Sequence, residues 1–116
     1  MLFLCYPKCS TCRKAKDWLD TNSVKYEERH IVEDNPTYEE LKKWNKVSGL
    51  PLKKFFNTSG MLYREMKLKD KLPDMSEEEQ LRLLSENGML VKRPMVVDGD
   101  KVLVGFKESD WKENLL

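Results

Sequence analysis

A chain of 116 residues holds one ordinary domain core, and 40% hydrophobic with 35% charged residues is a globular composition with a heavily charged surface. Three Trp, four Tyr and four Phe exclude a disordered chain. Lys and Arg number 21 and Asp and Glu number 20, so the net charge of +1 argues against a general nucleic-acid or membrane-surface binder. We therefore expect a single monomeric domain over 1–116 that makes no direct contact with nucleic acid or membrane.

No apolar run approaches the roughly 18 residues of a membrane span. The opening residues 1–6 are too short for a signal peptide and lack its basic leader, so we expect a cytoplasmic protein.

The first half of the chain predicts a strand, a helix and a second strand. Residues 2–6 form an apolar run that Pro7 ends, and a helical period follows from Ser10 to about residue 22. Loose alternation over 24–32 predicts a strand with one solvated side. A strand–helix–strand unit within about thirty residues predicts parallel strands with a right-handed crossover.

The middle of the chain predicts helices, and the end returns to strands. Capping boxes at Thr37 and Ser76 open two helices, and short helices and turns are expected over 50–72. Strands over 95–97 and 101–104 flank Asp98-Gly99, which predicts a hairpin with a primed turn there, and a last helix is expected within 106–116. These elements predict an α/β fold: a thioredoxin-like, mixed four-stranded sheet with a helical insertion (about 36–90) between the second and third strands.

All three cysteines lie within the first twelve residues, so they do not form the disulfide framework of a secreted domain. Cys9 and Cys12 form a C-x-x-C motif where the first strand gives way to a helix. The helix start favours a thiolate at Cys9, and Cys12 lies one turn further on. Four cations surround the pair: Lys8, Arg13, Lys14 and Lys16. This pattern predicts a nucleophile at Cys9 and a resolving thiol at Cys12.

Three other interpretations of the cysteines remain. Zinc usually takes four N or S ligands, and His30 and Cys5 are the only further candidates. The spacing of Cys5, Cys9 and Cys12 also matches the iron–sulfur motif of radical enzymes that use adenosylmethionine, although those enzymes need a larger barrel. The third interpretation is that the cysteines carry no chemistry. We expect no bound cofactor and no metal.

Three segments together resemble the ArsC/Spx family of the thioredoxin superfamily, in its uncharacterised arsenate-reductase-like branch. They are Tyr6–Ala15, then Phe56–Gly60 with Tyr63–Glu65, and finally Lys92–Asp98. The resemblance implies that Cys9 is the nucleophile, that Arg93 contacts an oxyanion, and that Pro94 follows a cis bond beside Cys9. It also places Asn57 on the substrate side.

Several positions depart from the arsenate reductases of that family. Cys5 stands where they have a His, Tyr6 where they have Asn and Cys12 where they have Ser. Two of their arginines align with Asn57 and Gly105, and Arg64 lies near enough to replace one. An arsenate group needs several charge-assisted donors, so these departures favour an internal Cys9–Cys12 disulfide over arsenate reduction.

Two functions follow as hypotheses. The first is a thiol–disulfide oxidoreductase whose substrate is a small oxidised or anionic molecule or a protein disulfide, with Arg13 and Arg93 stabilising the thiolate. A low-molecular-weight thiol or a thioredoxin or glutaredoxin system would supply its electrons. The second is a Spx-like regulator, in which the same disulfide switches contact with RNA polymerase. A basic stretch (Lys42, Lys43, Lys46, Lys53 and Lys54) is either a solvated face or a docking surface for an acidic partner.

Overall fold

The computed structural model describes all 116 residues, and its centre is a four-stranded mixed sheet. The strands are β1 (Leu2–Cys5), β2 (Glu27–His30), β3 (Met95–Asp98) and β4 (Lys101–Val104). Their order across the sheet is β2-β1-β3-β4; β1 and β2 are parallel, while β1–β3 and β3–β4 are antiparallel. The predicted α/β fold, with strand pairing of the thioredoxin type, is confirmed.

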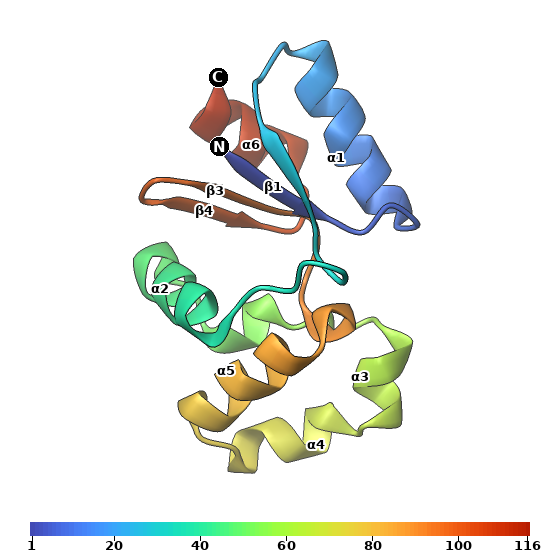
Figure 1. The fold of residues 1–116 in the computed structure, drawn as a ribbon, viewed down its shortest axis with the longest axis vertical. Coiled ribbons are helices and arrows are strands. Elements are labelled where there is room, and N and C mark those ends of the chain that lie inside the picture. The colour runs from blue at the N-terminus through green and yellow to red at the C-terminus, as the bar shows by residue number, and fades with distance from the viewer.

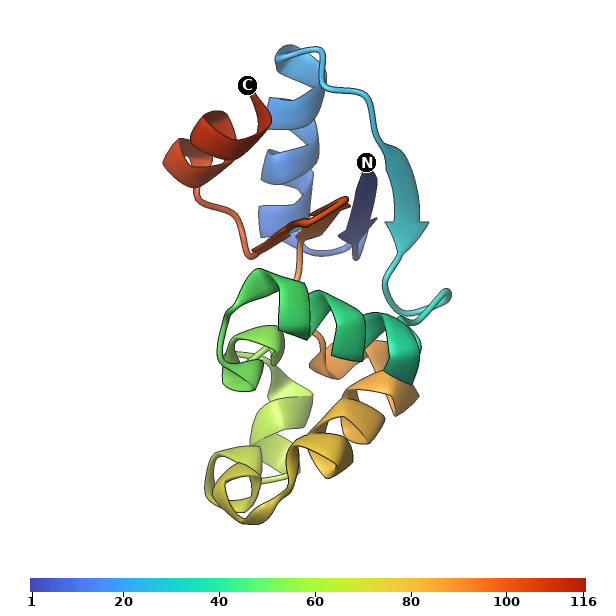
Figure 2. The same ribbon diagram turned by 90° about the vertical axis from the view of Figure 1, so that its left-hand side faces the viewer.

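Helices cover both faces of this sheet (Figures 1 and 2). On one face lie α1 (Ser10–Thr21) and α6 (Glu108–Leu115). On the other lies the helical segment between β2 and β3, which makes the molecule elongated at 42 × 27 × 24 Å. Its elements are α2 (Tyr38–Ser48), η1 (Leu52–Phe55), α3 (Met61–Glu65), α4 (Leu68–Lys71), η2 (Leu72–Asp74), α5 (Glu77–Glu86) and η3 (Gly88–Leu90).

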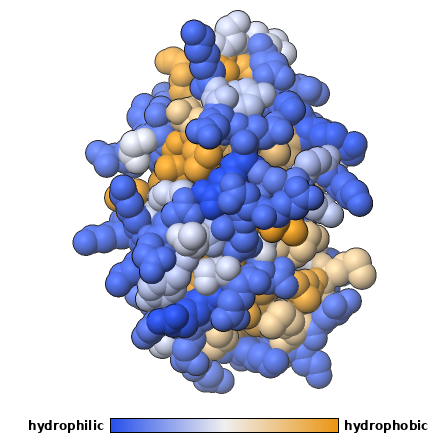
Figure 3. Space-filling model, viewed as in Figure 1, coloured by the Kyte–Doolittle hydropathy of each residue, from blue (hydrophilic) through white to orange (hydrophobic).

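Alternation along β1 divides the core into two clusters. Phe3 and Cys5 point toward α1 and α6, where seven buried residues form the smaller cluster around Trp111. Leu4 points the other way, into a cluster of sixteen buried residues shared with the helical segment. The outer surface in the view of Figure 3 is mostly hydrophilic, broken by small separate apolar patches. No helix has the length and apolar character that crossing a membrane requires.

The helix boundaries follow the predicted signals closely. Thr37 and Ser76 both form complete capping boxes, in which the hydroxyl accepts from the N–H of a glutamate three residues on and that glutamate's carboxylate accepts in return. Gly49, with φ of +69°, ends α2 in the left-handed conformation that glycine adopts at low cost.

Two predicted boundaries are wrong. The second strand covers only Glu27–His30, because it extends only as far as its pairing with the four residues of β1. Ile31 still donates to the Cys5 carbonyl at 2.9 Å. The hairpin turn consists of Gly99 and Asp100, since Asp98 is still paired with Lys101. Gly99 has φ of +60° and Asp100 does not have a positive φ, which is the pattern of a type II′ turn.

Candidate active site at the start of the first helix

Cys9 is the residue at which the loop after β1 becomes helix α1. Its backbone is extended (φ −86°, ψ 123°), its N–H donates to the Tyr6 carbonyl at 2.9 Å, and its carbonyl accepts from Arg13 at 3.1 Å. These bonds fix a tight turn around Pro7 and leave the sulfur at the N-terminal end of the helix, where backbone N–H groups lack partners. The Cys9 side chain is half-buried, so its sulfur remains open to a reactant.

The two sulfurs of the motif have opposite acid–base properties. Burial by itself raises the pKa of Cys9, but hydrogen bonds from the backbone and thiol of Cys12, the Thr11 N–H and the Arg93 guanidinium lower it below its ordinary value. Cys12 is 2% exposed, and burial together with the neighbouring Cys9 charge raises its pKa to about 12. Cys9 is therefore the more acidic sulfur of the pair, and Cys12 is the one that keeps its proton.

Cys12 is fixed from the strand side as well. The backbone N–H of Tyr6 donates to the Cys12 sulfur at 3.3 Å, which ties the second cysteine to the residue after β1. Cys5 lies on the same side of the sheet, is 4% exposed, and has its pKa raised to about 11, chiefly by burial. Cys5 is therefore a thiol packed in the core at neutral pH, as expected for a small hydrophobe.

Arg93 reaches the site from the opposite end of the chain. Its Nη1 donates to the Met89 carbonyl at 3.0 Å, and its guanidinium carbon lies 5.2 Å from the centre of the Tyr6 ring. These contacts hold the guanidinium close enough to Cys9 to help lower its pKa. The Arg93–Pro94 peptide bond is cis, as the resemblance implies, and Pro94 is buried.

The side chains of the other residues predicted for substrate binding form no hydrogen bond with Cys9. Arg13 is exposed on the first turn of α1 and contacts Cys9 through its backbone. Arg64 is exposed and donates to the Ser59 carbonyl at 3.2 Å. The N–H of Asn57 donates to the Leu90 carbonyl at 2.7 Å, which places Asn57 next to the segment that holds Arg93. The structure brings together Cys9, Cys12 and Arg93. The roles of these three residues, like those of Arg13, Asn57 and Arg64, remain predictions.

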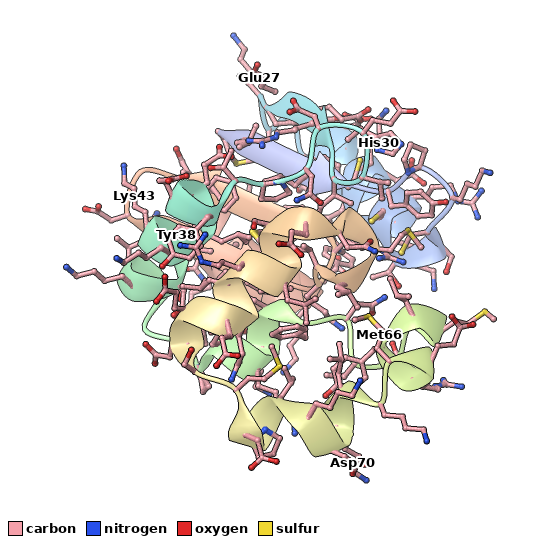
Figure 4. All side chains as sticks on the ribbon, turned by 60° about the horizontal axis from the view of Figure 1, so that its bottom comes forward. Glu27, His30, Tyr38, Lys43, Met66 and Asp70 are labelled. Carbon is pink, nitrogen blue, oxygen red and sulfur yellow. The ribbon has the colours of Figure 1, made fainter.

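The contribution of Tyr6 to the site was not predicted from the sequence. Its N–H binds Cys12, its carbonyl binds Cys9, and its ring lies against Arg93. An aromatic residue directly before the Pro7 turn was the available signal. His30, which Figure 4 shows at the end of β2, packs its ring edge-on to Tyr6 at 5.8 Å, and its Nδ1 accepts from the N–H groups of Val32 and Glu33. No three His, Cys, Asp or Glu side chains are grouped as metal ligands.

Several known proteins are similar to this chain in sequence and in structure. The model of the ArsC family matches residues 4–114. The uncharacterised protein YusI of Bacillus subtilis is 59% identical over 98% of this chain and 97% of its own length. The crystal structure of an ArsC-family-related protein from Bacteroides fragilis has 62% identity and a TM-score of 0.94, over 97% of this chain and 94% of that one.

A relative with a regulatory name is more distant. The regulatory protein MgsR of Bacillus subtilis is 31% identical over 95% of this chain and 86% of its own length. A match along nearly the whole sequence, joined to the same fold, establishes the relationship: the chain belongs to the ArsC family.

Proposed function

We propose that the protein is a thiol–disulfide oxidoreductase in which Cys9 is the nucleophile and Cys12 the resolving thiol. The observation that carries this proposal is the opposite acid–base character of two adjacent sulfurs at a helix start, with Arg93 against the reactive one. A structural cysteine pair needs no such asymmetry, whereas thiol exchange needs one thiolate to attack and one thiol held in reserve.

The reaction moves two electrons from the dithiol to the substrate. The Cys9 thiolate attacks one sulfur of a substrate disulfide, so a Cys9–substrate bond forms, the substrate S–S bond breaks and one substrate thiolate leaves. The Cys12 thiol then gives its proton to a departing thiolate or to solvent, and its sulfur attacks Cys9, releases the second substrate thiolate and forms the Cys9–Cys12 disulfide. A sulfenic acid would react at its sulfur in the same way and release water.

The first step also prepares the second. Burial is the main cause of the high Cys12 pKa, and while Cys9 is a thiolate its charge and its hydrogen bond raise that pKa further. Once Cys9 is part of a mixed disulfide, the two effects of Cys9 vanish, so the Cys12 pKa falls and its thiol loses a proton more readily. The order of the two steps is thereby favoured by the pair itself.

The substrate and the electron donor are proposed by chemical class. Arg93 supplies a fixed guanidinium beside the reactive sulfur and favours a reactant with an anionic group near its oxidised sulfur. We place a low-molecular-weight thiol, or a thioredoxin or glutaredoxin system, as the donor that restores the dithiol. Arsenate needs more donors than Arg93 alone offers at the sulfur, so it is not the substrate proposed.

Turnover of hydroxyethyl disulfide with a reduced thiol as donor tests the enzyme proposal. We expect Cys9→Ser to abolish turnover. We expect Cys12→Ser to accumulate a mixed disulfide at Cys9, visible as an added substrate mass. Cys5→Ser is the matched control and keeps turnover, because Cys5 is a core thiol. Full activity in Cys9→Ser, or loss of activity in Cys5→Ser alone, would refute the assignment.

The similarity to MgsR supports a second candidate, a regulator whose Cys9–Cys12 disulfide switches contact with RNA polymerase. Capture of purified RNA polymerase by the oxidised and reduced forms separates the two functions. The regulator predicts capture that depends on the redox state and is lost in Cys9→Ala. The enzyme predicts turnover and no capture.

A further inference from the structure

A groove of about 780 Å³ runs along β4, and Cys9 is not among the residues that line it. One wall comes from the end of α2 and from η1, and the other from the loop after β4 and the start of α6. Its volume lies in the usual range of ligand sites, about 300–1,000 Å³. Part of its lining is apolar and includes Leu50, which is 37% exposed and among the few large hydrophobic residues that face solvent.

The charge of this groove departs from that of the whole chain. Its ionisable lining consists of four lysines and one acid, namely Lys53, Lys54, Lys92, Lys107 and Asp110. The full sequence, by contrast, has nearly equal numbers of cationic and acidic residues. None of the four lysines forms an ion pair in the structure, so their charges are available to a partner of opposite sign.

The strand along the groove has an unused edge. Strand β4 pairs only with β3, and it is the last strand of the sheet. Across the two-residue turn, hydrogen-bonded pairs alternate with non-bonded pairs, and Gly105 still donates to the Pro94 carbonyl at 2.8 Å. Lys101, Leu103 and Gly105 therefore turn their backbone groups toward β3.

Val102 and Val104 consequently turn their backbone N–H and C=O groups outward. Neither residue takes part in any backbone hydrogen bond outside the sheet or in any side-chain hydrogen bond. Four backbone groups spaced for a strand thus lie along a groove with an excess of positive charge and apolar patches. An extended peptide can form hydrogen bonds with these backbone groups, whereas a compact anion would leave them unpaired.

We propose that this β4 groove (the cavity lined by Lys53, Lys54, Lys92 and Lys107) binds an extended acidic segment of a partner protein as an added strand. Backbone bonds to Val102 and Val104 supply the pairing, the lysines select acidic side chains, and the apolar lining takes the alternate residues of the segment. The site is independent of the cysteine chemistry.

The structure also divides the basic stretch of the sequence. Lys53 and Lys54 line the groove, whereas Lys42, Lys43 and Lys46 do not. Lys43 lies on the outer side of α2 (Figure 4). Lys42 and Lys43 are exposed, as are Lys53 and Lys54, so the two pairs allow matched charge reversals.

The test measures fluorescence anisotropy of a labelled octapeptide of alternating Glu and Val at low salt. We expect saturable binding that Lys53→Glu with Lys54→Glu weakens by about tenfold or more, and that added salt also weakens. Lys42→Glu with Lys43→Glu should change the affinity by less than about twofold. An octapeptide of alternating Ser and Val should bind about tenfold more weakly or not at all.

Hydrogen exchange then checks the backbone pairing. On binding, the amides of Val102 and Val104 should gain protection, and Cys9→Ser should bind the peptide as tightly as the unsubstituted protein does. The proposal is overturned if the acidic peptide does not bind, if both double variants weaken it equally, or if the β4 amides stay unprotected. A dimer that already protects these amides without peptide would also overturn it, in favour of a second copy at this edge.

Discussion

The two sides of the sheet differ in size and in the chemistry they hold. The side covered by α1 and α6 has seven buried residues, among them Cys5 and Cys12. The side covered by the helical segment has sixteen and no cysteine. Cys9 lies at the end where both meet: Cys12 approaches from α1, and Arg93 is held through Met89 by the segment. The smaller side therefore supplies the sulfur chemistry, and the larger side supplies the fixed cation.

The largest expected effect is a loss of stability on substitution of Trp111, which lies at the centre of the smaller cluster. Its ring is 1% exposed, meets Phe106 edge-on at 4.9 Å, and donates from Nε1 to the Gly105 carbonyl at 3.1 Å. Trp111→Ala should lower the free energy of unfolding by about 3–5 kcal/mol in a denaturant titration.

Val47 provides the comparison for that titration, because it lies at the surface of α2 and is 37% exposed. Val47→Ala should change stability by no more than about 0.5 kcal/mol. A Trp111→Ala variant as stable as Val47→Ala would show that the smaller cluster does not depend on this ring.

The next prediction separates the influence of the Arg93 charge on Cys9 from the influence of the N-terminal end of α1. Arg93→Ala removes one charge-assisted hydrogen bond to Cys9 and leaves the backbone N–H groups of Thr11 and Cys12 in place. The pKa of Cys9 should rise, and because fewer molecules then carry a thiolate, alkylation at pH 7 should slow by about threefold. Arg93→Lys should recover part of that loss, since it keeps the charge and loses the planar fork.

Arg82→Ala serves as the control for this series, because Arg82 pairs with Glu78 on the exposed face of α5. Its alkylation rate should equal that of the unsubstituted protein. Unchanged alkylation in Arg93→Ala would mean that the helix start alone holds the thiolate.

The smallest effect concerns the ion pair that joins β2 to the helical segment. Arg29 binds both oxygens of Glu40, at 2.6 and 2.8 Å, and this lowers the Glu40 pKa to about 2. A carboxyl whose folded pKa is depressed adds stability above its unfolded pKa, and that stability is lost as pH falls from about 4.5 toward 2. Glu40→Gln should abolish this acid-sensitive part, about 1 kcal/mol after allowance for solvent screening, while its amide oxygen can still cap α2.

The measurement is the free energy of unfolding of Glu40→Gln and of the unsubstituted protein across that pH range. The control is Glu78→Gln, because its pair with Arg82 is well over half exposed and should contribute almost nothing. Parallel curves for Glu40→Gln and the unsubstituted protein would contradict the expected role of Arg29.

The periodic parts of the fold were predictable from sequence because they follow local rules. Capping boxes, the apolar run of β1 and the hairpin spacing each depend on a few adjacent residues. The ends of β2 were not, because its length is set by its pairing with the four residues of β1, which is a tertiary effect. Cys9 and Cys12 were likewise predictable as a pair from their spacing at a strand–helix junction.

The contacts that hold the site residues in place could not be predicted from sequence patterns. The contact between Tyr6 and Arg93 joins residues more than eighty positions apart. The bond from the Arg93 side chain to Met89 ends on a backbone carbonyl, which has no signature in the sequence. The groove along β4 could not be predicted from the sequence either, because Lys53, Lys92 and Lys107 come from three distant segments.

The most direct test of the central claim is the alkylation rate of each cysteine by iodoacetamide as a function of pH, read by mass spectrometry. We predict that Cys9 reacts fastest at pH 7, with a midpoint below that of an ordinary thiol. Cys5 and Cys12 should react only as pH approaches about 11 and about 12, where their raised pKa values lie. A Cys9 that reacts no faster than Cys5 at neutral pH would contradict a thiolate at the start of α1.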